Sequence, residues 1–219
     1  MNSQRDEYKM DFESSFNEIR REIEADDLVR EKILPLSRSA VRKCSESIKL
    51  AHRGEYEAAR RGLEEANELI MKTRQEMDKS SYLSKSRILD TAYQELTEAA
   101  NVLSILEKNS LTPPSTFDIP SRAYLTGLAD TIGEIRRAIL ERLRNDDIVR
   151  ATEFLSIMEE VFEELNGFDF PNAIVPDLRR KCDVARGIIE RTRGDLTTAV
   201  RQDRLINEIG RFEERMKGE

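Results

Sequence analysis

Hydrophobic residues recur every three to four positions along almost the whole chain, and no segment alternates with a period of two. One example is the series Leu89, Tyr93, Leu96, Ala100 and Leu103, which forms a single apolar stripe at helical spacing. This pattern is typical of amphipathic helices that bury one face. The chain is therefore predicted to be all-α.

Proline, glycine and turn-forming residues divide the pattern into seven predicted helices. Pro35 should kink or split the first helix, Gly54 should end it, and Gly194 with Asp195 should separate the last two. Ser121 is the expected N-cap of the fourth helix. The helices are expected over residues 8–53, 55–77, 82–107, 121–143, 145 or 146 to 166, 177–193 and 195–216, with a proline-containing loop at 108–120. Short connections predict one helical domain over residues 1–219.

Composition supports this view and narrows the class of protein. Charged residues make up 36% of the 219 residues and aromatics only 6%, as in proteins built from long helices. Cys44 and Cys182 form neither a CxxC pair nor a disulfide framework, so no zinc site is expected. The charged N-terminus and the lack of an apolar run near ~20 residues predict a cytoplasmic protein without a membrane span. The net charge of −7 does not indicate nucleic-acid binding, but a basic patch can lie on one face.

Two predicted helices carry paired acids on faces that are not otherwise charged. Glu95 and Glu98 lie beside the apolar stripe of the third helix, among Ile88, Thr91, Val102 and Ile105. Asp130 and Glu134 of the fourth helix are flanked by small residues, including Gly127, a costly choice inside a helix.

Four carboxylates from two helices suit a hard divalent cation such as Mg²⁺ or Mn²⁺. Such an ion can polarise a phosphodiester and activate a water molecule. Acids at these spacings are also common as ordinary solvated charges. Spacing alone favours that simpler interpretation.

A row of cations lies on the second half of the first predicted helix. Arg38, Arg42, Lys49 and Arg53 share a sector of roughly 60°, which is suited to tracking a phosphate backbone. The alternative is a solvated face paired with acids of a neighbouring helix, and without further information it is the favoured one. His52, the single histidine, lies near this face. It is expected to pack, cap or contact nucleic acid rather than to act as a catalytic base.

Three segments at these positions resemble the translin family, in particular its factor X branch. They are residues 38–53, the sequence TAYQELTEA at 91–99 and the sequence AYLTGLADTIGEIRR at 123–137. The resemblance continues into the last third of the chain. It departs in the short loop at 108–120 and in Arg122 or Ala123, which stands where the motif begins with Asp. The compact form resembles a prokaryotic, archaeal-type homologue.

The resemblance implies a seven-helix bundle that assembles into a hollow barrel, with an octamer of identical chains favoured. It implies a Mg²⁺- or Mn²⁺-dependent endoribonuclease that acts on single-stranded RNA, with DNA as a second candidate ligand. Catalysis and metal binding would fall to Glu95, Glu98 and Asp130, with Glu134 as a further metal ligand. Nucleic acid would be contacted by the basic residues and His52. Two alternatives stay open: a binding protein without catalysis, and a helical scaffold that only oligomerises.

Overall fold

The computed structural model describes residues 2–217, with side chains described from Phe12 to Met216. The described residues form six α-helices and two 3₁₀ turns and contain no strand, so the predicted all-α fold is confirmed. The helices are α1 (Asn2–His52), α2 (Tyr56–Met77), α3 (Asp90–Lys108), α4 (Ser121–Arg144), α5 (Ile148–Asn166) and α6 (Leu178–Lys217). The 3₁₀ turns are η1 (Leu83–Lys85) and η2 (Pro114–Thr116).

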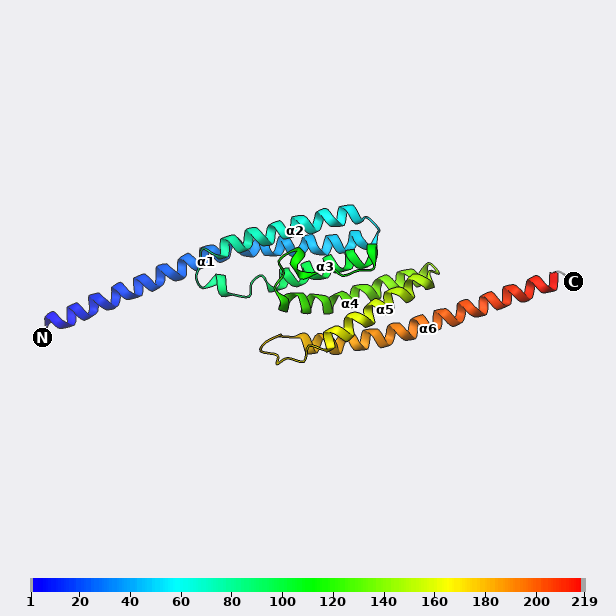
Figure 1. Ribbon diagram of the computed structural model, residues 1–219. Helices are drawn as coiled ribbons and strands as arrows, with labels where there is room; N and C mark the ends of the chain where they lie inside the picture. Colours follow the sequence, from blue (N-terminus) through cyan, green and yellow to red (C-terminus); the bar gives the residue numbers. More distant parts are fainter. Residues whose placement is uncertain (1, 218–219) are drawn as a thin grey trace.

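The helices pack side by side with α3 and α4 in the middle (Figure 1). Helix α1 packs on α2 and α3, and α4 packs on α3, α5 and α6. The core contains fully buried side chains from α1, α3, α4 and α5, namely Ile33, Leu96, Ile132, Phe154 and Met158. The first part of α1 and the last part of α6 project from opposite sides of this bundle (Figure 1).

Helix α1 runs without interruption through Pro35, so the predicted split is wrong. A proline inside a helix removes one hydrogen bond to the carbonyl of the residue four positions earlier, here Glu31. Both Pro35 and Glu31 are exposed, so water can bind that carbonyl. Ile33 and Ala40, on the other side, are fully buried and hold the helix against the bundle.

The break predicted at Gly194 and Asp195 is also absent, because α6 is continuous. Gly194 lies on an exposed face, where its low helix propensity costs only about 1 kcal/mol. Around it, Thr192 and Leu196 are buried, and Asp195 pairs with Arg136 of α4 at 2.9 Å. These contacts hold one helix where two were predicted, and the chain therefore has six helices in its described part rather than seven.

Two helix starts and one helix cap differ from the prediction because of local chemistry. Helix α3 begins at Asp90 rather than near residue 82, because the Ser80 hydroxyl accepts a hydrogen bond from the Leu83 amide and begins a 3₁₀ turn. Helix α4 begins at Ser121, but Pro120 is its N-cap and no side chain caps it, so the predicted N-cap role of Ser121 is wrong. Helix α5 begins later than expected, where the Asp147 carboxylate accepts a hydrogen bond from the Arg150 amide.

Candidate functional site

The two helices with paired acids approach each other unusually closely at Gly127 of α4. A Cβ atom at this position would lie 2.5 Å from the carbonyl oxygen of Gln94 and 2.7 Å from Cβ of Thr97, both on α3. No side chain fits at these distances, so only glycine permits this packing. The unfavourable glycine noted in the sequence thus has a structural reason, and it brings the two acidic faces together.

Glu95, Glu98, Asp130 and Glu134, named here the acidic cluster, influence one another electrostatically. The pKa of Glu98 is raised to about 8, first by burial and then by the charges of Glu95, Asp130 and Glu134. The pKa of Glu95 is also raised, by burial and then by Asp130. These carboxylates therefore share one half-buried site rather than forming part of a solvated face.

Helix α6 contributes a cation that the sequence did not reveal. Lys181 donates a hydrogen bond to Asp130, and the Lys181 side chain is only 15% exposed. Its positive charge also opposes the rise in the pKa of Glu95 and Glu98. Because Lys181 lies some fifty residues further along the chain, only the packing of α6 on α4 could reveal this pairing.

Helix α1 closes the other side of the acidic cluster. His52 Nε2 lies 2.6 Å from Glu134 Oε2, and Arg137 lies 3.3 Å from the same oxygen. The hydrogen bond from His52 is the main cause of the lowered pKa of Glu134. Buried Cys44 also faces the acids, since Glu95 and Glu98 add to the burial that raises its pKa to about 12. His52 therefore contacts the acidic cluster, whereas the sequence had suggested packing, capping or nucleic-acid contact.

The chemistry of the acidic cluster suits a hard divalent cation, although its side chains are arranged as ion pairs. Among the described residues, no three acids, histidines or cysteines come together as a ready metal site. Asp130 is bound by Lys181 and Glu134 by His52. Carboxylate oxygens are the preferred ligands of Mg²⁺. The pKa of Glu98 is raised first by burial and then by repulsion from the other acids, and a cation would relieve that repulsion. A metal ion would have to compete with Lys181 for Asp130.

Arg38, Arg42, Lys49 and Arg53, named here the basic row, are all exposed on α1. Within the described part of the chain, none of the four has an acidic partner, and Arg42 donates to the Ser39 hydroxyl at 2.7 Å. The alternative of a face neutralised by a neighbouring helix therefore does not describe this surface. At about 100° per residue, the basic row lies roughly 40° to 100° around α1 from His52. At about 1.5 Å per residue, Lys49 and Arg53 are within about 5 Å of His52 along the helix axis, whereas Arg38 is about 21 Å away. The end of the basic row at Lys49 and Arg53 therefore lies next to the acidic cluster.

Comparison with known proteins gives the family. A model of the translin family matches residues 15–192, a span that contains the acidic cluster and the basic row. The chain belongs to the translin family. An uncharacterised protein of Methanocaldococcus jannaschii is 33% identical over 188 residues, which cover 85% of this chain and 83% of the relative.

Solved structures of translin-family relatives agree with the fold. AfC3PO in complex with duplex RNA is 34% identical to this chain and has a TM-score of 0.75. The match covers 84% of this chain and 96% of the AfC3PO chain. Apo-NeC3PO has the same coverage and TM-score at 22% identity, and it supports the fold alone. The resemblance expected from the sequence is confirmed.

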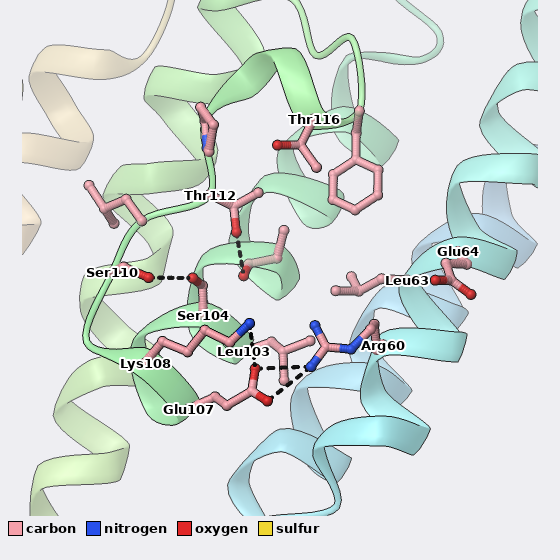
Figure 2. Close-up of a pocket in the computed structure, with 14 residues that line it drawn as sticks. Arg60, Leu63, Glu64, Leu103, Ser104, Glu107, Lys108, Ser110, Thr112 and Thr116 are labelled. Atoms are coloured by element: carbon pink, nitrogen blue, oxygen red, sulfur yellow. Dashed lines mark hydrogen bonds and ion pairs between the residues drawn. The ribbon is translucent and has the colours of Figure 1, made fainter.

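A separate cavity in this translin-family chain lies on the opposite side of α3 from the acids. It has a volume of about 470 Å³ and lies between α2, α3 and the loop before η2 (Figure 2). Arg60 and Glu107 form a salt bridge at its mouth, with an N–O distance of 2.9 Å, and Ser104 bonds Ser110. Its cations are already neutralised by Glu107, which also pairs with Lys108.

No helix in the described residues is long and apolar enough to cross a membrane.

Proposed function

We propose that this protein is a Mg²⁺- or Mn²⁺-dependent endoribonuclease. The observation that carries the proposal is the acidic cluster, in which burial and neighbouring carboxylates raise the pKa of Glu98 to about 8. Burying several carboxylates together costs free energy unless a cation neutralises them. Such clusters are typical of functional sites. The relative that was crystallised with duplex RNA supports RNA as the class of substrate.

Each acid has a proposed role. Glu95, Glu98 and Asp130 hold the metal, and Glu134 is a further ligand or support, oriented by His52. A bound divalent cation supplies a polarised phosphodiester and an activated water molecule. Lys181 holds Asp130 in place, and with a cation on Asp130 the Lys181 ammonium group would be available to a phosphate oxygen. The surrounding core of α3 and α4 keeps the carboxylates half-buried, which strengthens their attraction for the cation.

The basic row is proposed to hold the RNA backbone. Its four cations are exposed and free of acidic partners among the described residues, and Lys49 and Arg53 lie within one turn of His52, which contacts the acidic cluster. Such cations bind phosphates without reading the sequence. The substrate is proposed to be single-stranded RNA. Because the relative was crystallised with a duplex, both forms need to be assayed.

The assembly is proposed to be a hollow homo-oligomer, with an octamer favoured. A basic row that faces the interior and an acidic exterior would reconcile the net charge of −7 with RNA binding. A light-scattering mass several times that of the 25.3 kDa chain is expected. A monomer at micromolar concentration would contradict this model.

The enzymatic proposal is tested with a labelled unstructured RNA and a labelled duplex of the same length. With Mg²⁺ or Mn²⁺, the purified protein should cleave the single strand faster than the duplex. EDTA should stop cleavage of both RNAs. Cleavage that continues in EDTA would overturn the metal-dependent mechanism. Faster cleavage of the duplex would overturn the strand preference alone.

The second candidate is a nucleic-acid-binding protein without catalysis. It is favoured by the ion pairs of Asp130 with Lys181 and Glu134 with His52, which satisfy both acids without a metal. It predicts RNA binding without cleavage in any divalent metal. Under this alternative, replacing the acids would leave the function of the protein unchanged.

A further inference from the structure

Both projecting helix ends carry an exposed apolar row with the same spacing. The N-terminal extension is residues 12–30 of α1, and the C-terminal extension is residues 201–216 of α6. The two rows are Phe12, Phe16, Ile19 and Ile23, and Leu205, Ile209, Phe212 and Met216. Successive members are four, three and four residues apart in both, and each side chain is at least half exposed. This spacing is that of the seam of a coiled coil, and here neither seam has a partner.

The charges beside the two seams are complementary in one register. The seam positions of a coiled-coil heptad are called a and d, and the a positions of the two rows are Phe16, Ile23, Ile209 and Met216. We place Phe12 opposite Leu205 in a parallel pair. The residue just before each a position then faces the partner residue that is five positions further along the aligned helix. The facing pairs are then Glu13 with Arg201, Arg20 with Glu208, and Asp27 with Arg215. Ser15 faces Glu213, so no like charges meet. Two copies of the N-terminal extension in parallel would instead oppose Glu22 to Asp27 twice.

A groove continues the seam of the N-terminal extension toward the bundle. It has a volume of about 460 Å³ and is lined by Ile19, Ile23, Tyr82 and Leu83. Its acidic rim carries Glu22, Asp26 and Asp27 against one cation, Arg30, which pairs with Asp27 at 3.4 Å. In the register above, Met216 lies opposite Ile23, and Arg215 reaches the acidic rim. Arg215 therefore adds a cation at a rim with an excess of acids, and Met216 continues the apolar seam into the groove.

The direction of the helices decides which extensions can meet. Helices α1 and α6 run the same way, and their extensions leave opposite sides of the bundle (Figure 1). The two extensions of one chain therefore cannot pair with each other, but a second copy displaced along the long axis places them parallel. We propose that the C-terminal extension of one copy binds the N-terminal extension of the next as a parallel coiled coil.

This contact joins different surfaces on the two partners, so it links copies head to tail into a ring or a chain. Helix α6 extends well past residue 192, where the match to the translin family ends. The C-terminal half of the contact therefore lies outside the family match, whereas the N-terminal half lies inside it from residue 15. The contact does not depend on the proposed nuclease activity. A seam of two heptads is weak alone, but every copy takes part in two such contacts, which reinforce each other in a closed ring.

Disulfide trapping in the full-length protein tests the pairing. Ile19 and Phe212 lie in the same layer of the proposed coil, and both native cysteines, Cys44 and Cys182, are buried. Ile19→Cys protein mixed with Phe212→Cys protein should form a mixed disulfide dimer several-fold faster than either protein alone. The matched control pairs Arg21→Cys with Glu214→Cys, whose positions share a register but point away from the seam.

A charge exchange gives a second readout on the same cysteine proteins. Arg215→Glu on the Phe212→Cys chain should slow mixed-disulfide formation several-fold, and Asp27→Lys on the Ile19→Cys chain should restore it. Circular dichroism with the parent helix content verifies folding in each variant. Three results would overturn the proposal: trapping no faster than in the control pair, dominant disulfides between identical extensions, or no response to the charge exchange.

Discussion

The acidic cluster and the basic row are neighbours on the same protein, but the structure treats their charges in opposite ways. The acids are half-buried, and the pKa values of Glu95 and Glu98 are raised by burial and by neighbouring carboxylates. The cations of the basic row lie in water, and none has an acidic partner among the described residues. The acids of the cluster therefore act as a unit, whereas each cation of the basic row contributes a small and separate amount to the binding free energy. We therefore expect catalysis to depend on the first and substrate affinity on the second.

The largest effect is expected from removing an acid of the cluster. Asp130→Ala should slow RNA cleavage by about 100-fold or more, since outer partners of metal ligands alone change activity by ~10–100-fold. Affinity for RNA should stay the same or increase, because a negative charge is removed. Glu141→Ala, an exposed acid on the same helix, is the matched control and should cleave at the parental rate. Equal rates for both variants in a single-turnover assay would refute the assignment of Asp130.

The next effect concerns the close approach that creates the acidic cluster. Gly127→Ala should lower the free energy of unfolding by ~1–3 kcal/mol, because the added methyl group overlaps α3. Gly133→Ala is the control on the same helix, where a Cβ meets nothing within 4 Å. It should be neutral or stabilise by up to ~1 kcal/mol through helix propensity. Urea unfolding measures both variants, and similar values would contradict the close packing.

Stability of the metal-free protein should also depend on pH through Glu98. Its folded pKa of about 8 exceeds the ordinary glutamate value of 4.5 in the unfolded chain, so the folded state binds more protons between these pH values. The unfolding free energy should therefore fall as pH rises from 5 to 8, by at most ~1.4 kcal/mol per pH unit from this group. Glu98→Gln, which stays neutral, should lack this slope when unfolding is followed in EDTA. Parallel pH profiles for the two proteins would show that Glu98 is not perturbed.

The smallest effect per residue is expected from the basic row. Arg38→Ala with Arg53→Ala should weaken RNA binding a few-fold at moderate salt. It should lower the slope of log affinity against log salt by about 1.4, which is ~0.7 for each lost phosphate contact to a single strand. Lys72→Ala with Lys79→Ala removes two exposed cations of α2 and its C-terminal end and serves as the control. An unchanged slope in fluorescence anisotropy would exclude the basic row from RNA binding.

The sequence predicts the helical parts of this fold well because each helix has an apolar stripe of its own. It fails where a local breaker meets tertiary packing. Pro35 and Gly194 both lie on exposed faces, so the buried residues beside them outweigh their low helix propensity. The sequence provides the propensity of a residue, but only the structure shows which side of the helix faces water.

The candidate site was also only partly predictable from the sequence. Helical spacing and the family resemblance identify Glu95, Glu98, Asp130 and Glu134, and Gly127 indicates a close approach. The pairing of Lys181 with Asp130 and of His52 with Glu134 joins residues more than fifty positions apart. Periodicity describes one helix at a time, so it cannot show which helix supplies the neutralising cation.

The most direct test compares one variant of each region on a single RNA. Glu98→Ala and the Arg38→Ala, Arg53→Ala double variant are each measured for RNA Kd and for the single-turnover cleavage rate at saturating protein with Mg²⁺. The acid variant should keep the parental Kd and lose cleavage, while the double variant should bind more weakly and cleave at the parental rate once saturated. Parental cleavage by Glu98→Ala, or loss of the same quantity in both variants, would contradict the separation of catalysis from binding.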